Sequence, residues 1–508
     1  MTTARAALAL GERDLSLEDL AGIAREGVQV GLSPEVMENC FSSYVRLAGL
    51  VAGDRNVYGL TVACGQLDDV EVAPENRSQL DLVRAHASGV GEPMRFDQSR
   101  AMMASRLHTL ARGMSGVSPQ TLAALIAYLN ADLAAAVPEL GSVGSSDLAP
   151  LAHMALALCG EGETLYRDKS GTIKGILSRE ALELAGLELL ELQGRDGLAL
   201  INGLSQTIGL ASLCLIDLKM SLNTSACAAA LTGLALYPGG DRNQAASLAL
   251  KKHPAGSELV ARLESLIEND SKDNPEIRSA LSIRYALPVL ATAVDSYRQT
   301  RAVVEAELNA VVDNPLLFQD GSHTNNSGNT CGQRIATSLD QLSIALSALC
   351  VATEHRIARL ISRTPAGGLP PYLVHPDNEP GASYGLMYAQ YTAASLTGEI
   401  RARCQPRSIS SLAAGGDLED LNSFAAGAAL HLEWLRGMLD YLIAIETMAA
   451  VQAFDCLARE LPGKLAPFAR SVRETVPVLK EARPLGPDID RLKEAMREGR
   501  LNPPEIIG

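Results

Sequence analysis

Aromatic side chains are scarce in this chain, and their scarcity argues against a strand-rich fold. Of the 508 residues, 4% are aromatic and one is tryptophan, whereas 47% are hydrophobic, with alanine and leucine dominant. Strands favour aromatic and β-branched residues, so this mixture indicates long packed helices. The chain also lacks a run of about 18 uncharged apolar residues, which argues against a membrane span.

Paired cysteines and excess positive charge are lacking as well. The nine cysteines are scattered and none forms a Cys-x-x-Cys pair, which indicates reduced thiols and no metal site. The net charge of -15 disfavours nucleic acid as a partner. The apolar patch Ala6 to Leu10 is short for a secretory signal and has no clear cleavage site after it. We therefore expect a cytoplasmic protein without metal, nucleic-acid or membrane partners.

Helical spacing dominates the second half of the chain. Ile335, Leu339, Leu342, Leu346 and Leu349 recur as one helical stripe, and long apolar segments also cover 196–235, 276–308, 385–404 and 425–457. This pattern predicts a mainly α fold with a long central helix bundle. We expect a smaller mixed N-terminal region over 1–205, which carries a glycine-rich loop, and a long-helix bundle with a C-terminal helical region over 206–508.

The glycine-rich loop leads directly into an apolar helix. Residues 141–153 read Gly-Ser-Val-Gly-Ser-Ser-Asp-Leu-Ala-Pro-Leu-Ala-His. Ser145, Ser146 or Asp147 would cap the helix, and Pro150 would be tolerated in its first turn. Backbone N–H groups at such a helix start attract negative charge. The loop therefore predicts a polar site at the end of a helix.

The loop and a series of further segments resemble the histidine and aromatic amino-acid ammonia-lyases and aminomutases. The matches occur in the expected order and comprise Val57-Tyr58-Gly59, His86 to Pro93, Gly197 to Gly203, Ser282-Ile283-Arg284, Glu307 to Ala310, Asp313-Asn314-Pro315, Ser327-Gly328-Asn329, Gln390 to Ala394 and Glu419-Asp420. The resemblance implies a fumarase- and aspartase-like helix bundle, assembly as a homotetramer with shared active sites, and a small amino acid as substrate. It also implies a methylidene-imidazolone (MIO) cofactor, which forms when an Ala-Ser-Gly triad in this loop cyclises.

The resemblance assigns catalytic roles to four residues. Tyr58 falls on the tyrosine that removes the β-proton, and its pKa, ordinarily about 10, would have to fall, which positive helix ends could cause. Glu419 matches a polar residue that would receive the amine proton or position the amine. Ser145 and Ser146 stand where the triad is expected. A tyrosine with a bonded hydroxyl and a helix salt bridge are the ordinary structural readings of Tyr58 and Glu419.

Substrate binding is assigned to four other residues. Asn202 falls on an asparagine that holds a substrate or cofactor carbonyl, and Asn329 on a polar residue near the site. Arg284 falls on the arginine that grips the substrate carboxylate, for which a planar guanidinium is suited. His86 matches a position that selects the substrate side chain, and the histidine-specific members of the family carry histidine there.

The sequence departs from the family inside the loop itself. Two serines stand where the family has three residues, and the triad glycine, whose missing side chain favours ring closure, is absent. Literal Xaa-Ser-Gly triads occur at 87–89, 114–116 and 326–328, but the first and third belong to other family segments and the second to a helix-like stretch. A second site tyrosine is replaced by Leu281, and a histidine by Cys331.

Three hypotheses therefore stay open. The first is an MIO-dependent ammonia-lyase or aminomutase in which the cyclised triad is written with fewer letters. The second is an enzyme without MIO that eliminates, isomerises or cyclises a carboxylated substrate on the same fold. The third is a silent homologue that only binds a small molecule or partner. A carbon–nitrogen lyase-like enzyme that acts on an α-amino acid is the reading we favour.

Overall fold

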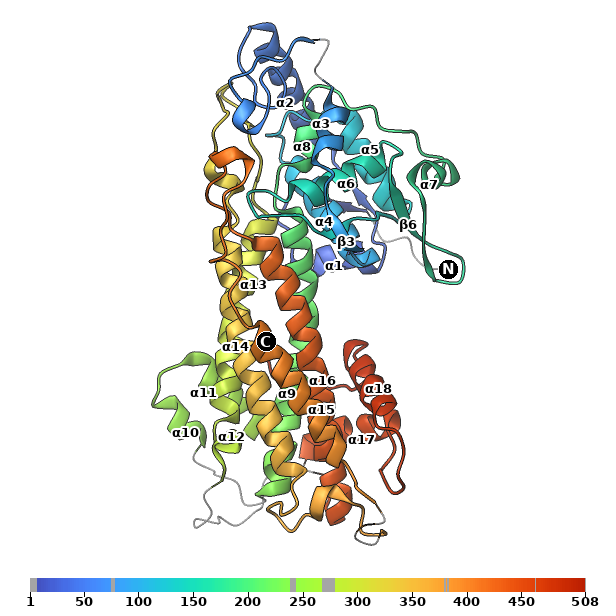
Figure 1. Cartoon of the computed structure of the whole chain (residues 1–508), viewed down its shortest axis with the longest axis vertical. Coiled ribbons are helices and arrows are strands. Elements are labelled where there is room, and N and C mark those ends of the chain that lie inside the picture. The colour runs from blue at the N-terminus through green and yellow to red at the C-terminus, as the bar shows by residue number, and fades with distance from the viewer. Residues whose placement is uncertain are drawn as a thin grey trace. The chain divides into compact units, whose positions relative to one another are not determined.

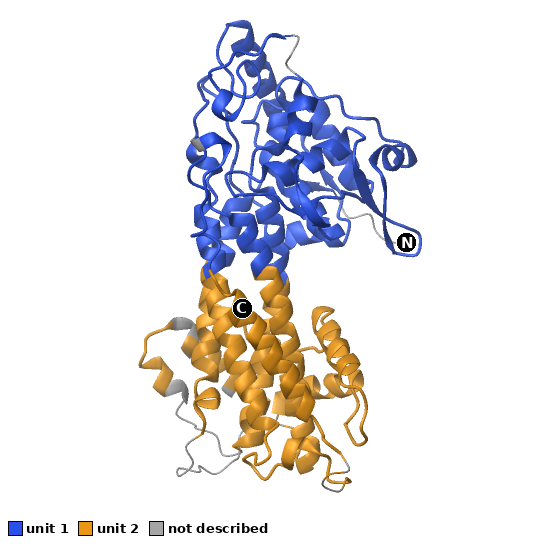
Figure 2. Ribbon diagram, viewed as in Figure 1, with its two compact units in different colours: residues 1–216, 300–340, 406–431 blue, residues 217–299, 341–405, 432–508 orange. Residues whose placement is uncertain are grey.

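The computed structural model describes residues 7–74, 78–237, 244–266, 279–378, 381, 383–461 and 463–507, and is mainly helical (Figure 1). Its contacts divide the chain into two units (Figure 2). Unit 1 comprises 1–216, 300–340 and 406–431, and unit 2 comprises 217–299, 341–405 and 432–508. Unit 1 thus includes three segments that the sequence-based division places with the bundle, namely 206–216, 300–340 and 406–431.

Unit 1 combines short helices with small sheets. Its helices are α1 (Leu17–Arg25), α2 (Pro34–Ala52), α3 (Gln79–His86), α4 (Phe96–Leu110), α5 (Pro119–Asn130), α6 (Leu148–Leu158), α7 (Ser178–Ala185) and α8 (Asp196–Ile201). Its strands are β1 (Leu8–Ala9), β2 (Val30–Gly31), β3 (Val90–Pro93), β4 (Leu133–Ala135), β5 (Pro138–Leu140), β6 (Glu163–Arg167), β7 (Ile173–Leu177), β8 (Leu316–Leu317) and β9 (His323–Thr324). The sheet β4-β6-β7 is antiparallel, with Leu133 opposite Tyr166.

Helix α4 lies at the centre of unit 1, which accounts for its unusual content of buried polar residues. It packs against α1, α5 and β4. Arg100, almost wholly buried, donates to the carbonyl oxygens of Leu129, Leu133 and Ile23. A buried guanidinium is tolerated when its N–H groups are bonded in this way. Arg100 therefore ties three separate segments to the central helix.

Long helices make up most of unit 2. Helices α9 (Ser205–Leu236), α13 (Ala286–Leu308), α14 (Gln333–Leu360) and α16 (Ala425–Leu457) have residues in both units. Unit 2 also contains α10 (Gln244–Ala249), α11 (Pro254–Glu264), α12 (Leu281–Arg284), α15 (Met387–Arg403), α17 (Ala466–Thr475) and α18 (Gly486–Arg497). The predicted stripe of α14 is buried from Ile335 to Leu349. The expectation of a mainly α bundle protein is confirmed.

Three helical stretches are long and apolar enough to cross a membrane by length and composition, contrary to the sequence-based expectation. They cover Asp196–Leu236, α14 and α16, and 94%, 56% and 83% of their most apolar windows are buried inside the protein. Polar or charged residues such as Asn202, Asp340 and Asp440 interrupt these stretches, so none of them is an unbroken run of uncharged apolar residues. The apolar surface of Asp196–Leu236 and of α16 is therefore largely covered by protein, whereas α14 leaves a larger part of its window exposed.

A buried ion pair joins three helices of the bundle. Arg356 on α14 contacts both carboxylate oxygens of Glu446 on α16, at 2.6 and 2.8 Å. Thr232 on α9 donates to the same carboxylate at 3.0 Å. Both charged side chains are almost wholly buried.

We expect Glu446→Ala to lower the free energy of unfolding by about 3–5 kcal/mol, because Arg356 would be left buried and uncompensated. Chemical denaturation followed by circular dichroism measures the loss. Glu399→Ala is the matched control, since its pairing with Arg403 is exposed on α15 and such pairs contribute about 1 kcal/mol or less. Equal losses in the two variants would contradict the assigned role of the pair.

Candidate active site

The loop 144–147 lies where four helices begin within unit 1. Helix α6 follows it directly, and the carboxylate of Asp147 accepts a hydrogen bond from the N–H of Thr207 in the first turn of α9. The N–H of Gly332, which precedes α14, donates to the carbonyl of Gly144 at 3.3 Å. The N–H of Phe424, which precedes α16, donates to the carbonyl of Val143 at 2.8 Å. The partially positive ends of these helices therefore surround the loop.

Both serines of the loop are held by asparagine side chains. The hydroxyl of Ser145 donates to Oδ1 of Asn422 at 2.7 Å, and that of Ser146 donates to Oδ1 of Asn202 at 2.5 Å. Asn422 in turn donates through Nδ2 to the carbonyl of Glu419 at 2.9 Å. The sequence-predicted residues Ser145, Ser146, Asn202 and Glu419 are thus brought together, and Asn422 is a fifth member that sequence reasoning missed.

A chain of asparagines connects this loop with Tyr58. Asn202 donates through Nδ2 to the carbonyl of Asn314 at 2.6 Å, and Asn314 donates through Nδ2 to the carbonyl of Asn325 at 2.9 Å. The N–H of Tyr58 donates to Oδ1 of Asn325 at 3.3 Å. Tyr58 and Ser146 therefore belong to one connected polar network, although they lie far apart in the sequence. The sequence signal for Asn314 is its place in Asp313-Asn314-Pro315, one of the segments that resemble the family.

The hydroxyl of Tyr58 is held in an environment that disfavours its ionisation. Burial raises the pKa of Tyr58 to about 12, and the nearby Cys64 and the charge of Glu419 act in the same direction. The N–H of Gly65 donates to the hydroxyl at 2.9 Å and opposes the rise. The expectation that helix ends would lower this pKa is therefore wrong for the single chain, because burial, the thiol of Cys64 and the charge of Glu419 all disfavour the ionised phenol.

Asp147 is a buried acid whose role sequence reasoning had limited to capping. It is the N-cap residue of α6, but its side chain makes no bond to that helix. Its carboxylate accepts instead from the hydroxyl of Ser142 at 2.6 Å and from the N–H of Thr207 at 2.9 Å. Burial raises the pKa of Asp147, and these bonds oppose the rise. Asp147 therefore locks the loop onto the first turn of α9.

Two buried arginines, Arg195 and Arg106, hold together the segments that carry the asparagine network. Arg195 contacts both carboxylate oxygens of Asp313, at 2.9 and 3.0 Å. Arg106 donates to the carbonyls of Ala199 and Val312, each at 2.9 Å, and burial lowers its pKa to about 10. These contacts join the segment that carries Asn202 to the segment that carries Asn314.

The remaining sequence-predicted residues make other contacts. His86, in the last turn of α3, bonds through Nδ1 to the carbonyl of Leu82 at 2.7 Å. Asn329 donates to the carbonyl of Val311 at 2.6 Å. Arg284 belongs to unit 2, where its guanidinium donates to the carbonyl of Ser279 at 3.2 Å. None of these contacts reaches the loop, so the roles assigned to His86, Asn329 and Arg284 stay predictions.

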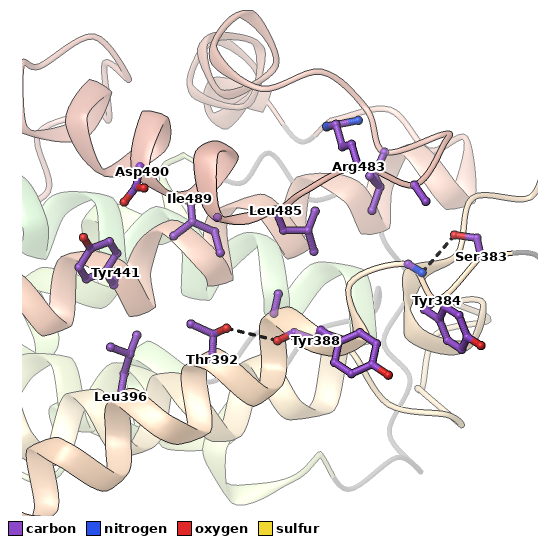
Figure 3. Close-up of a pocket in the computed structure, with 15 residues that line it drawn as sticks. Ser383, Tyr384, Tyr388, Thr392, Leu396, Tyr441, Arg483, Leu485, Ile489 and Asp490 are labelled. Carbon is purple, nitrogen blue, oxygen red and sulfur yellow. Dashed lines mark hydrogen bonds between the residues drawn. The ribbon is translucent and has the colours of Figure 1, made fainter.

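A cavity of about 520 Å³ lies in unit 2, lined by residues of α15, α16 and α18 and by the segments before α15 and α18 (Figure 3). Tyr384, Tyr388 and Leu485 contribute apolar surface, and Arg483 and Asp490 are its charged side chains. The cavity contains none of the sequence-predicted site residues. Its position offers no support for placing the active site in unit 2.

The comparisons with known proteins cover almost the whole chain. The family model of the aromatic amino acid lyases matches residues 15–477. This chain belongs to the aromatic amino acid lyase family. It is 36% identical to the histidine ammonia-lyase of Symbiobacterium thermophilum, over 96% of each chain. Among solved structures, it is 30% identical to a tyrosine aminomutase from Streptomyces globisporus, with a TM-score of 0.88 over 98% of each chain. It is 27% identical to the histidine ammonia-lyase of Trypanosoma cruzi, with a TM-score of 0.89 over 98% of this chain and 94% of that one.

Family membership confirms the resemblance seen in the sequence and the mainly α fold. It identifies the chain as a lyase- or aminomutase-type enzyme that removes or shifts the amine of an amino acid. It does not favour the hypotheses of an enzyme without MIO or of a silent homologue. Because enzymes of this family generally depend on MIO, the loop has to be tested for its fit to that group.

The backbone conformation of the loop fits MIO in one respect that the amino-acid sequence does not show. Ser146 has a φ of +70°, a conformation that favours glycine and that side chains rarely adopt. It thus has the backbone of the residue that the sequence lacks. Gly144 and Ser146 also pair with each other as an isolated bridge, which brings their backbones together across a single residue. The residues Gly144, Ser145 and Ser146 would hold the group, with Asn202 and Asn422 beside it.

Proposed function

We propose that this enzyme eliminates ammonia from histidine, or from a closely related α-amino acid, at the loop 144–147. The observation that carries the proposal is the pair of loop serines, which are held by Asn202 and Asn422 among the starts of four helices. The close relatives named histidine ammonia-lyase, and a histidine at position 86, support histidine as the substrate.

The chain's own residues supply binding and proton transfer. MIO, when present, supplies the electrophile that activates the amine of the substrate as a leaving group. Tyr58 accepts the β-proton at its hydroxyl oxygen, and Glu419, whose charge acts on that hydroxyl, receives or positions the amine. Asn202 orients a carbonyl, and Asn329 completes the polar side of the site. Arg284 grips the substrate carboxylate from a neighbouring subunit.

The test is to incubate the purified enzyme with histidine, phenylalanine and tyrosine and to measure ammonia and the absorbance of the unsaturated acid. Release of ammonia from histidine, with equal amounts of both products, is the expected result. If none of the three amino acids loses ammonia, ammonia elimination as proposed here is excluded.

Amine migration is a second candidate, favoured by the 30% identity to a tyrosine aminomutase. In that case the enzyme would return the amine to the neighbouring carbon and yield a β-amino acid. Chromatography of the same reactions distinguishes the two, because a β-amino acid forms without free ammonia.

We further propose that the enzyme is a cytoplasmic homotetramer with shared active sites. Ile344, Tyr388 and Tyr391 on α14 and α15 are each more than half exposed, and apolar stripes of this kind favour burial against another copy. Light scattering should give the mass of four chains. Mixing inactive Tyr58→Phe and Arg284→Ala variants should restore part of the activity, because hybrid tetramers contain some intact sites. A monomer, or no restoration, would contradict the proposal.

The high pKa of Tyr58 predicts the pH dependence of turnover. Below a pKa of about 12 the ionised fraction of the phenol rises roughly tenfold for each pH unit. We therefore expect kcat, which reports groups in the enzyme–substrate complex, to increase steadily from about pH 7 to pH 10. A pH–rate profile at saturating substrate measures this, and a plateau beginning near neutral pH would show that the base has a much lower pKa in the complex.

A further inference from the structure

We propose that Gly144-Ser145-Ser146 is the segment of this chain that cyclises, with Ser146 in place of the family's glycine. The backbone nitrogen of Ser146 closes the ring onto the carbonyl carbon of Gly144, and Ser145 provides the exocyclic double bond. The proposal rests on the proposed function, since it identifies the residues from which this enzyme makes its own electrophile. It also explains how a loop one residue short retains the family's chemistry.

The backbone of the loop is arranged for ring closure. Gly144 and Ser146 are both in the left-handed region, with φ of +86° and +70°, and they pair with each other across Ser145. A serine adopts this conformation only where its surroundings impose it. Here the hydroxyl of Ser146 is fixed by Asn202, and the N–H of Asp147 donates to the carbonyl of Gly203 at 2.7 Å. Contacts on both sides of the peptide bond therefore hold Ser146 in a glycine-like shape.

The carbonyl of Gly144 is polarised for attack. Its oxygen accepts hydrogen bonds from the hydroxyl of Ser423 at 2.7 Å and from the N–H of Gly332 at 3.3 Å. Two donors on one carbonyl oxygen stabilise the negative charge that develops when a nucleophile adds to the carbon. The nitrogen that adds is that of Ser146, its bridge partner.

The first position of the triad has to be glycine in this short loop. A Cβ added to Gly144 would collide with Oγ of Ser423 and would lie 2.7 Å from the backbone nitrogens of Phe424 and Ala425. The chain therefore approaches the start of α16 too closely for the alanine that the family carries. The loss of one residue and the replacement of alanine by glycine therefore belong together, because the shorter loop leaves no room for a Cβ at position 144.

The atoms balance without an oxidant or a co-reactant. The nitrogen of Ser146 bonds to the carbonyl carbon of Gly144, and the carbonyl oxygen leaves as water with the hydrogens of the Ser146 and Ser145 amides. Ser145 then loses its Cα hydrogen and its hydroxyl as a second water, which leaves a carbon–carbon double bond to Cβ. Asn422, which accepts from the Ser145 hydroxyl, positions that leaving group.

The intact mass of the purified full-length enzyme tests the proposal. We expect a mass lower than that of the sequence by two water molecules, with the loss confined to the peptide that contains residues 142–147. An ultraviolet absorbance difference against Ser145→Ala should accompany it. Ser145→Ala has no hydroxyl to lose, so its mass should fall by one water only and it should lack this absorbance, whereas Ser146→Gly should keep both the loss of two waters and the absorbance.

Ser115→Ala is the matched control, because Ser115 is the centre of the literal triad Met114-Ser115-Gly116, and this variant should still lose two waters. An unmodified mass in the wild-type enzyme, or a mass loss in the peptides containing 87–89, 114–116 or 326–328, would overturn the proposal. If the mass is unmodified but ammonia is released, the proposed function holds and the cyclisation of this segment is rejected. The mass loss without ammonia release would instead reject the proposed function and keep the cyclisation.

Discussion

Replacement of Tyr58 by phenylalanine should lower kcat by about 10²–10⁴-fold, the contribution that a positioned general base typically makes. The substitution removes only the hydroxyl, which accepts a hydrogen bond from the N–H of Gly65 and lies beside the thiol of Cys64. The backbone bond from Tyr58 to Asn325 remains, so the polar network and the fold should be preserved. Steady-state kinetics with the substrate identified by the ammonia assay measures the effect, and KM should change far less than kcat.

Tyr166→Phe is the matched control for Tyr58→Phe. Tyr166 lies on β6, paired with β4 and β7 and away from the asparagine network, so kcat should be unchanged. The thermal unfolding midpoint of both variants should stay close to that of the wild type. Turnover that survives in Tyr58→Phe would remove the tyrosine from the mechanism and direct attention to Glu419, whose charge acts on the same hydroxyl.

Those parts of the fold and site that depend on short stretches of sequence were predictable. The stripe from Ile335 to Leu349 predicts one buried face of a long helix, because every third or fourth residue returns to the same side. Likewise, Asn202 and the serines of the loop were found because each stands in a short motif. The structure adds that Asn202 and Ser146 contact each other directly.

The partners of these residues were not predictable, because they come from distant parts of the chain. Ser145 is bonded to Asn422, and Tyr58 to Asn325, each more than 250 residues away in sequence. No local pattern specifies such a pairing, which only the packing of helix starts creates. The raised pKa of Tyr58 is unpredictable for the same reason, since it depends on burial and then on the neighbouring Cys64 and Glu419. The division into two units likewise follows contacts between segments that are distant in sequence.

The glycine-like backbone of Ser146 shows why a motif can lose a residue type and keep its geometry. A sequence comparison registers serine at this position as the loss of glycine. The conformation is nevertheless maintained by Asn202 on the side chain and by Gly203 on the following N–H. Asn202 and Gly203, which make these two contacts, lie directly after α8. The conformation of the loop therefore depends on the residues that hold this segment in place.

Asp313→Asn should be strongly destabilising, because Asp313 compensates the buried arginines that hold this segment in place. Asp313 is wholly buried, contacts both terminal nitrogens of Arg195, and lies 3.7 Å from Arg106. The neutral amide would leave two buried guanidinium groups without a compensating charge, and such a loss typically costs about 3–5 kcal/mol. We expect the free energy of unfolding, measured by chemical denaturation, to fall by that amount.

Asp320→Asn is the control for Asp313→Asn, because it makes the same chemical change in the same segment at an exposed position, where the carboxylate accepts from the N–H and the hydroxyl of Ser322. Its stability should match that of the wild type. Arg106 also donates to the carbonyls of Ala199 and Val312, close in sequence to Asn202 and Asn314, and Arg195 donates to the carbonyl of Asn314. The Asp313 variant should therefore lose the mass signature of cyclisation along with stability, since Ser146 would no longer be held by Asn202. A stable Asp313→Asn enzyme that still sheds two waters would show that the loop keeps its shape independently of the buried arginines.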